Sequence, residues 1–423
     1  MREKLTQGLK ALKPAIKKAV PPGVIRAGKA LVVKQIQQQM LKNPKIPYER
    51  GAYPDGINLI GPVDASTGLG QSFRLVERVI RGMGIPYMIY PFAATVYSRT
   101  DISEYEDRIG HELKYSVNLW HVSALEFGEL YAAVGKKAFD RHYNIAYWLW
   151  ELENFPDEWV GYTRVLDEIW TPSEFISRAL RRKVTLPVVT VPYWVSAKTD
   201  PERFSRKWFR LPEKRFLFLM MYDSNSVSER KNPDGAIAAF RRAFTPDRRD
   251  VALVIKAGSL DKNGYRRLKS KLTGYRNIRI IRGNLEKTEV NSLIACSDAL
   301  ISLHRAEGFG LVLAEAMLNH VPVIATDWSA NTEFMDDTCA CMVPYRMVRL
   351  TQNIFPYKKG EQWADPDVEA AARFMRRLAD DHAYWKQISD AGFEHVREKL
   401  GQDQATRKIR RRMEPVFLPE DES

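Results

Sequence analysis

The sequence predicts an α/β protein made of two domains, each with a parallel β-sheet covered by helices on both faces. From Gly56 onward, short apolar runs with the length of buried strands alternate with helix-length segments. The 423 residues are 45% hydrophobic and 28% charged, which is typical of a soluble chain of two or three domains. No apolar run approaches the ~20 residues that a membrane span needs.

Residues 1–50 are expected to form a basic N-terminal arm. Residues 1–46 hold eleven lysines and arginines and one acid, which gives +10 of the formal net charge of +13. Apolar residues recur there on one helical face beside lysines: Leu5, Leu9, Leu12, Ile16 and Val20. The arm suits an anionic membrane surface; the alternatives are a solvated tail or a helix packed on the first domain. Nucleic acid is not an expected partner, because no recognised binding fold accompanies the charge.

The first domain is expected over residues 51–200, and residues 192–212, which mix proline, charges and aromatics without a clear period, are the expected linker to the second domain. The predicted strands are 57–61, 87–90, 116–120, 143–149 and 188–191, and residues 168–175 are expected to run from a further strand into a Ser-capped helix. Parallel sheets place ligand sites outside the carboxyl ends of their strands. Gly68 and Gly70 follow the first strand, His121 the third and Glu151 the fourth. For each, a structural role in the backbone or the core is the alternative.

The second domain is expected over residues 201–395, with strands at 215–222, 251–255, 278–281, 299–303 and 322–326. After its first strand, Ser224, Arg230 and Lys231 bring a hydroxyl and two cations to the start of a helix. That chemistry suits a diphosphate. Lys256, at the end of the next strand, is a further candidate cation.

The stretch from Ser297 to Met317 organises the chain. A buried strand leads into a turn with Gly308 and Gly310, and a helix starts at Leu311. Such a turn offers free backbone N–H groups and the positive end of a helix dipole, which favour a phosphate or a sugar hydroxyl. Glu307 and Glu315 bracket the turn with seven residues between them.

These residues resemble the donor site of family 4 of the retaining glycosyltransferases. The resemblance covers about residues 56–413 and rests on the two glutamates around Gly-Phe-Gly together with three flanking stretches. The stretches are Arg-Gly-Asn-Leu at 282–285, Pro-Val-Ile-Ala-Thr at 322–326 and Trp-Ser-Ala-Asn-Thr-Glu at 328–333. It implies the GT-B fold, in which two Rossmann-like domains face each other across a cleft.

The resemblance also implies roles for single residues. Glu315 would bind the donor ribose, and Glu307 with the backbone of Gly308, Phe309, Gly310 and Leu311 would hold the donor sugar. Asn284 and Leu285 would seat the nucleotide base. Lys231 and Arg230, with Lys256 and Ser224 nearby, would balance the charge of the diphosphate, and His121 would reach the reacting sugar. Glu151, Gly68 and Gly70 would lie on the acceptor side.

The sequence departs from the family at one position. An arginine and a lysine five residues apart usually hold the diphosphate, but if Lys231 matches that lysine, position 226 is a serine. Arg230 or Lys256 would then supply the second charge.

No metal or other cofactor is expected, because paired cations replace the metal in this family. Asp336-Asp337 and Asp380-Asp381 do not form a D-x-D loop at a strand end. Three cysteines, Cys296, Cys339 and Cys341, lack metal-ligand spacing and are typical of reduced thiols in a cytoplasmic protein.

The predicted reaction moves a sugar from a nucleotide diphosphate sugar to a hydroxyl of a glycan or lipid-linked acceptor in cell-surface polysaccharide synthesis, on the inner face of the plasma membrane. A GT-B epimerase or phosphorylase, and a catalytically silent binding subunit, are the alternatives. Residues 396–423 are expected to return to the first domain as a helix, with the basic run 407–412 either solvated or on the membrane.

Overall fold

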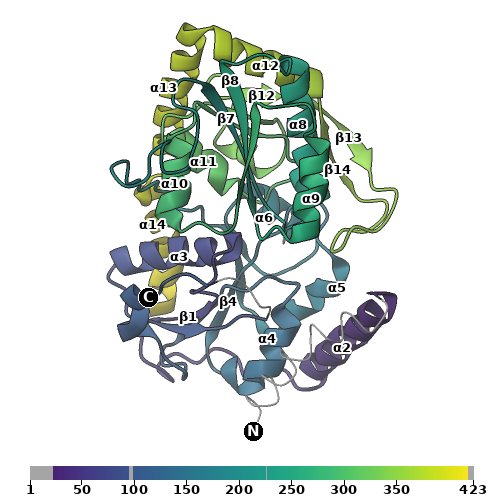
Figure 1. Cartoon of the computed structure of the whole chain (residues 1–423). Helices are drawn as coiled ribbons and strands as arrows, with labels where there is room; N and C mark the ends of the chain where they lie inside the picture. Colours follow the sequence, from purple (N-terminus) through teal and green to yellow (C-terminus); the bar gives the residue numbers. More distant parts are fainter. Residues whose placement is uncertain (1–21, 95–98, 225, 418–423) are drawn as a thin grey trace. The chain divides into compact units, whose positions relative to one another are not determined.

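The computed structural model describes residues 22–94, 99–224 and 226–417, with side chains described from residue 31 onward. The chain divides into two compact units (Figure 1). Unit 1 contains Met1–Leu149, Asn154–Tyr193 and Gln402–Ser423, and unit 2 contains Trp150–Glu153 and Trp194–Gly401. The predicted amphipathic pattern from Leu5 to Val20 lies outside the described residues.

Unit 1 contains a six-stranded parallel sheet with the order β2-β1-β3-β4-β5-β6. Its inner strands are buried along their whole length, apart from the first residue of the fourth strand, because helices cover both faces of such a sheet. The strands are β1 (Ile57–Gly61), β2 (Tyr87–Pro91), β3 (Val117–Trp120), β4 (Tyr143–Tyr147), β5 (Glu168–Thr171) and β6 (Val188–Thr190).

The helices of unit 1 begin where the sequence supplies caps. Thr67 accepts a hydrogen bond from the Gly70 N–H at the start of α3, and Ser173 accepts one from Ile176 at the start of α6. The helices are α2 (Pro22–Lys42), α3 (Gly68–Gly82), α4 (Phe127–Val134), α5 (Asp157–Val160), α6 (Glu174–Arg181) and α14 (Gln402–Phe417), with short 3₁₀ turns η1 (Ser103–Arg108), η2 (Lys136–Ala138) and η3 (Gly161–Val165).

The described part of the N-terminal arm contacts unit 1. Helix α2 packs against α4 and η3, Met40 is buried, and the Gln37 amide donates to the Glu158 carbonyl at 2.6 Å. Further along, Lys45 forms an ion pair with Asp167 at 2.8 Å. From residue 31 onward, the arm is therefore packed on its own unit, although Leu31 and Leu41 remain exposed.

The last helix, α14, belongs to unit 1 as well. Arg412 donates two hydrogen bonds, of 2.9 and 2.7 Å, to the fully buried carboxylate of Glu168, and the Val416 carbonyl accepts one from the Tyr48 hydroxyl. The expectation that the basic run 407–412 is either solvated or on a membrane is therefore wrong for Arg412. Its guanidinium neutralises a charge inside the unit.

Unit 2 contains a second six-stranded parallel sheet, with the order β12-β11-β10-β7-β8-β9. The strands are β7 (Phe216–Asp223), β8 (Val251–Gly258), β9 (Ile278–Arg282), β10 (Ala299–Ser302), β11 (Val323–Thr326) and β12 (Cys341–Val343). A separate antiparallel hairpin, β13 (Tyr345–Arg349) and β14 (Gln362–Pro366), follows β12. The sequence analysis did not predict β12 or this hairpin.

The helices of unit 2 cover both faces of its sheet. Helix α12 packs on α8, and α11 packs on α10 and α13. In Figure 1 these two groups lie on opposite sides of β7 and β8. The helices are α7 (Ser228–Lys231), α8 (Pro233–Ala243), α9 (Lys262–Lys271), α10 (Lys287–Ala295), α11 (Leu311–Leu318), α12 (Val368–Asp380) and α13 (His382–Lys399), with a 3₁₀ turn η4 (Ala330–Glu333).

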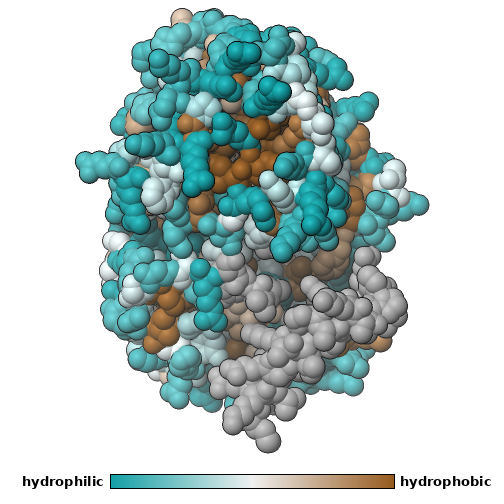
Figure 2. Space-filling view, in the orientation of Figure 1, coloured by the Kyte–Doolittle hydropathy of each residue, from teal (hydrophilic) through white to brown (hydrophobic). Residues whose placement is uncertain are grey.

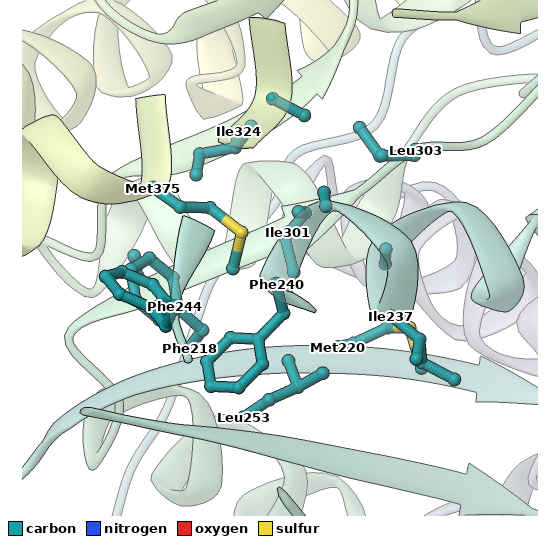
Figure 3. Close-up of a cluster of buried hydrophobic side chains, with 14 of the residues drawn as sticks. Phe218, Met220, Ile237, Phe240, Phe244, Leu253, Ile301, Leu303, Ile324 and Met375 are labelled. Atoms are coloured by element: carbon teal, nitrogen blue, oxygen red, sulfur yellow. The ribbon is translucent and has the colours of Figure 1, made fainter. Parts of the chain in front are cut away.

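The core of unit 2 forms between its sheet and the pair α8 and α12. Phe218 of β7 packs against Phe240 of α8 and against Phe244, which caps that helix, with ring centroids 6.3 and 5.7 Å apart. Met375 of α12 belongs to the same cluster (Figure 3). On the face shown in Figure 2, hydrophilic residues cover most of the surface, with apolar residues visible between them. Burial of these rings fixes the sheet whose edge bears the candidate site.

We expect Phe240→Ala to lower the free energy of unfolding by roughly 3–5 kcal/mol, because it removes a fully buried ring and leaves a cavity. Chemical denaturation followed by circular dichroism measures the change. Phe355→Ala is the matched control: its ring is 51% exposed, and we expect a much smaller loss. Equal losses in the two variants would contradict this description of the core.

Candidate functional site

The candidate site lies where the strand order of the second sheet reverses. From β7 the chain adds β8 and β9 on one side and then returns to place β10 on the other side. The carboxyl ends of β7 and β10 therefore form a topological switch point, the usual place for a ligand in an open parallel sheet. Arg230 and Lys231 follow β7, and Glu307 follows β10.

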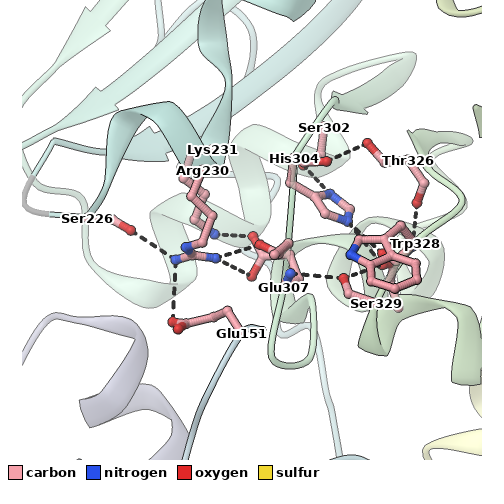
Figure 4. Close-up of polar contacts among 12 residues, drawn as sticks. Glu151, Ser226, Arg230, Lys231, Ser302, His304, Glu307, Thr326, Trp328 and Ser329 are labelled. Atoms are coloured by element: carbon pink, nitrogen blue, oxygen red, sulfur yellow. Dashed lines mark hydrogen bonds and ion pairs between the residues drawn. The ribbon is translucent and has the colours of Figure 1, made fainter. Parts of the chain in front are cut away.

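The structure brings the three predicted charged residues together. Lys231 Nζ hydrogen-bonds Glu307 Oε1, and Arg230 Nη1 lies 3.3 Å from Glu307 Oε2 (Figure 4). The side chain of Arg230 is 7% exposed, whereas that of Lys231 is 26% exposed. Arg230 is thus part of the frame of the site, and Lys231 is the cation with more access to solvent.

The charge of Glu307 is fixed by these two partners. Burial alone would raise the pKa of its carboxyl, but Lys231 and Arg230 outweigh this effect and lower the pKa to about 2. Glu307 is therefore ionised at neutral pH and accepts hydrogen bonds only, as a residue that binds sugar hydroxyls must.

The turn after Glu307 has the backbone that its glycines allow. Gly310 has φ +96° in the left-handed region and directly precedes α11, so a side chain at this position would be strained. Phe309 is buried against Phe334, with ring centroids 5.3 Å apart, while Leu311 is partly exposed at the first position of the helix.

A polar network that the sequence analysis did not predict supports this turn (Figure 4). Ser329 accepts a hydrogen bond from the Glu307 N–H at 2.9 Å, and buried His304 contacts Asn331 Oδ1 at 3.0 Å through Nε2. Ser329 has φ +80° and ψ −155°, a conformation that is essentially restricted to glycine. Strain of this kind is typical of functional sites. Both Ser329 and Asn331 lie in the Trp-Ser-Ala-Asn-Thr-Glu stretch. That stretch was the signal in the sequence by which the two residues could have been found.

Glu315 lies within α11 and is 1% exposed. Its Oε1 accepts a hydrogen bond from Lys287 at the start of α10, and its Oε2 has no partner among the described residues. A buried carboxylate oxygen without a donor is costly unless a ligand supplies one. The sequence analysis named Glu315 but missed Lys287, because the two are 28 residues apart.

A second polar group gathers at the ends of β7, β8 and β9. Lys256 is 8% exposed. A Cβ added at Gly258 would lie 3.4 Å from Lys256 Nζ, 3.5 Å from Asp223 Cγ and 3.7 Å from Asn284 Oδ1. Gly258 thus leaves a space that three polar side chains surround. Burial lowers the pKa of Lys256.

Two further residues that were predicted to bind the nucleotide sugar, Ser224 and Leu285, lie beside this group. The Ser224 hydroxyl donates to the Gly258 carbonyl at 2.9 Å, so it closes the turn after β7. Leu285 is partly exposed next to the exposed Asn284 in the loop after β9. Their predicted contacts with a nucleotide stay predictions.

His121 lies in unit 1, at the end of β3, and is fully buried. Its Nε2 is 2.8 Å from the Ser72 hydroxyl, its ring stacks on Tyr147 at 4.6 Å, and Nδ1 has no partner in the described structure. Burial lowers the pKa of His121 to about 3, so the ring is neutral at pH 7. The predicted contact of His121 with a sugar is not tested by this arrangement.

The acceptor-side candidates differ in their surroundings. A Cβ at Gly70 would lie 2.1 Å from the Ala65 carbonyl oxygen, so Gly70 is required for packing, whereas Gly68 has open space around it. Glu151 belongs to unit 2, where its Oε1 lies 3.6 Å from Arg230 Nη2. The structure therefore places Glu151 beside Arg230, which is one of the residues predicted to bind the diphosphate.

Away from this site, Asp336, Cys339 and His395 offer ligand atoms within 4.8 Å of one another, the one such group found in the described ranges. This group of three side chains includes neither Glu307 nor Glu315. The expectation that the protein works without a metal stays a prediction. None of the helices in the described part of the chain combines the length and apolar character that crossing a bilayer requires.

Residues 202–345 match the family model of the glycosyl transferases group 1. A search of curated proteins by sequence finds no match.

Several solved structures resemble this chain in fold. Anabaena Alr3699/HepE, in complex with UDP and glucose, is 12% identical with a TM-score of 0.64 and covers 85% of this chain and 100% of its own. A glycosyltransferase from Rickettsia africae is 14% identical with a TM-score of 0.59, covering 87% and 100%. WaaG, a glycosyltransferase involved in lipopolysaccharide biosynthesis, is 14% identical with a TM-score of 0.55, covering 86% and 100%. The predicted fold class, with two Rossmann-like domains, is confirmed.

We expect His121 to make the protein less stable in acid. The ring is neutral when folded, with a pKa of about 3, but binds a proton below about pH 6.5 when unfolded. The unfolded state therefore binds more protons, and stability falls as the pH drops below 6.5. Between pH 7 and 5.5, wild type should lose about 1 kcal/mol more unfolding free energy than His121→Gln. Identical losses in denaturant titrations at the two pH values would contradict this.

Proposed function

Residues 202–345 of this chain belong to the glycosyl transferases group 1 family, and from that premise we propose that the protein transfers a sugar from a nucleotide diphosphate sugar to an acceptor hydroxyl. The observation that carries the proposal is the meeting of Glu307, Lys231 and Arg230 at the switch point of the second sheet. An ionised acid beside two cations suits a ligand with sugar hydroxyls next to phosphate charges.

Each part of the donor has a proposed partner. Glu315 accepts hydrogen bonds from the ribose, and its buried Oε2, which has no partner among the described residues, is the acceptor that supports this role. Glu307 and the backbone N–H groups after Gly308 hold the sugar. Lys256 and Asn284, which surround the space at Gly258, lie at the edge of the sheet proposed for the nucleotide base.

The reaction forms a bond between the acceptor oxygen and the anomeric carbon while the bond from that carbon to the diphosphate breaks. Negative charge grows on the departing diphosphate, and Lys231 with Arg230 stabilises it. The acceptor proton passes to the leaving phosphate, so the new bond forms on the face that the diphosphate leaves and the anomeric configuration is retained. Two cations at this position make a metal unnecessary in the proposal.

A uridine diphosphate sugar is the first donor to test. The Anabaena HepE structure contains UDP and glucose, and the pneumococcal O-GlcNAc transferase GtfA, 14% identical, contains UDP and GlcNAc. For the acceptor, a glycan or a lipid-linked glycan of the cell surface is proposed. WaaG, which acts in lipopolysaccharide biosynthesis, is consistent with that class.

A catalytically silent binding subunit is the second candidate. It was suggested by the serine at position 226, where the family usually has an arginine. The buried guanidinium of Arg230 donates to the Ser226 hydroxyl at 3.0 Å, so a guanidinium reaches this position from elsewhere in the same loop. This contact favours the enzyme over the silent subunit.

We expect a thermal-shift screen of nucleotide sugars to identify the donor. A ligand present at 100 times its dissociation constant stabilises the fold by about 2.7 kcal/mol. Turnover with that donor should fall by at least about a hundredfold in Glu307→Gln, which keeps the size of the side chain but removes its charge.

Glu398→Gln, a substitution of an exposed glutamate on α13, is the matched control and should retain turnover. A flat response to every nucleotide sugar, or full turnover in a folded Glu307→Gln protein, would contradict the proposed function.

The N-terminal arm is proposed to hold the enzyme on the inner face of the plasma membrane. Its excess of basic residues is the support, since each contributes about 1 kcal/mol at an anionic surface. Changing Lys10, Lys13, Lys17 and Lys18 together to Gln should release the protein from phosphatidylserine vesicles in a sedimentation assay.

The control for the arm changes four exposed basic residues of α9 to Gln: Lys262, Arg266, Arg267 and Lys269. This variant should bind vesicles as wild type does. Equal loss from both variants would indicate a general charge effect, and wild type that sediments equally with uncharged vesicles would contradict the electrostatic model.

A further inference from the structure

Arg230 is held from several directions in a place where it has almost no contact with solvent. Nη1 donates to the Ala306 carbonyl at 2.8 Å and faces Glu307, while Nη2 donates to Ser226 and lies 3.6 Å from Glu151 Oε1 (Figure 4). Burial alone would lower the pKa of Arg230, but the groups around it, with Tyr357, Glu151 and Glu307 foremost, raise it. The guanidinium is therefore a permanent charge with a fixed plane.

Glu151 is itself held by a residue more than two hundred positions later in the chain. The Tyr357 hydroxyl donates to Glu151 Oε2 at 3.1 Å, which leaves Oε1 facing Arg230. Tyr357 is 2% exposed and packs on Trp150 and Trp363, with ring centroids 5.5 and 6.0 Å apart. The hydroxyl thus has a rigid support, and it sets the direction in which the carboxylate points.

Tyr357 lies in the segment between β13 and β14, and this hairpin is also joined to the other side of the site. The Ala364 N–H donates to the Arg305 carbonyl at 2.9 Å, and Arg305 pairs with Asp365 at 3.1 Å. The Arg305 N–H in turn donates to the Arg230 carbonyl at 2.7 Å. Arg305 is two residues before Glu307, so the hairpin is linked through Arg305 to the backbone of Arg230 and to the segment that carries Glu307.

We propose that Glu151 and Tyr357 are positioning residues: the β13–β14 hairpin, through the Tyr357 hydroxyl, orients the Glu151 carboxylate, which holds the Arg230 guanidinium in line with the leaving diphosphate. This inference rests on the proposed function. It replaces the acceptor-side role that the sequence suggested for Glu151, because the carboxylate is engaged by Tyr357 on one oxygen and faces Arg230 with the other.

Because the charges of the four side chains balance, removing one of them should change ligand affinity and the rate of transfer in opposite directions. Glu151 and Glu307 balance Arg230 and Lys231. Removing the charge of Glu151 leaves one positive charge in excess, so a nucleoside diphosphate should bind more tightly. The same change frees the guanidinium from its fixed plane, so the rate of transfer should fall. A loss of fold would weaken both properties together.

The experiment measures kcat, the KM of donor and acceptor, and the Kd of the nucleoside diphosphate by calorimetry. For Glu151→Gln we expect kcat to fall at least about tenfold, the nucleoside diphosphate to bind several-fold more tightly, and the acceptor KM to stay unchanged. Glu151→Asp keeps the negative charge but places it one methylene further from Arg230. This variant should have the Kd of wild type for the nucleoside diphosphate and the low kcat of Glu151→Gln.

Tyr357→Phe removes only the hydroxyl and should lower kcat in the same direction. Because Tyr357 acts through Glu151, the double variant should be no slower than Glu151→Gln alone. Tyr345→Phe, on β13 of the same hairpin, is the matched control. Its ring is tilted by 47° against that of Trp328, with ring centroids 5.2 Å apart, and its hydroxyl has no role in the proposed orientation of Glu151, so kcat should not change.

Three results would overturn the proposal: a raised acceptor KM with unchanged kcat in Glu151→Gln, additive losses in the double variant, or weaker binding of the nucleoside diphosphate to a folded Glu151→Gln protein. Failure of the proposed function would look different. Wild type would then show no turnover with any donor, while the calorimetric comparison of wild type, Glu151→Gln and Glu151→Asp would still report on Arg230.

Discussion

The site depends on one electrostatic constraint: a buried carboxylate at the end of β10 must be neutralised by the two cations that follow β7. Without Lys231 and Arg230, burial would raise the pKa of Glu307, and without Glu307 the buried guanidinium would lack its closest acid. Each strand end therefore needs the charges of the other to form the site. The reversal of strand order makes them neighbours, so the topology of the sheet determines the chemistry of the site.

The surroundings of Glu307 keep this arrangement in one geometry. The hydroxyl of Ser329, held in a strained backbone conformation, fixes the Glu307 N–H, and His304 fixes Asn331 of the same turn. A neutral imidazole suits that task, and burial lowers the pKa of His304 accordingly. The free energy stored in the strained turn is supplied by the packed core beneath it, as is common at preorganised sites.

The parallel sheets could be predicted from the sequence because their strands are continuous apolar runs, and β1, β2, β7 and β10 lie within one or two residues of the predicted ranges. The acids and cations of the donor loop could be named because strand, glycine turn and helix follow each other locally. The rest is non-local. Lys287 with Glu315, and Tyr357 with Glu151, join residues far apart in the chain, and the short polar strands of the β13–β14 hairpin carry no strong periodic signal.

Unit 1 is assembled from three separated stretches of chain, and the last of them ends with α14. During synthesis on a ribosome, the Glu168 carboxylate therefore has to wait for Arg412, which is translated 244 residues later. All residues of unit 2 are translated before Arg412 is added to the chain. The N-terminal half of the polypeptide thus receives its last packing partner only after unit 2 has been translated, a departure from the usual N-to-C order in which domains are completed during synthesis.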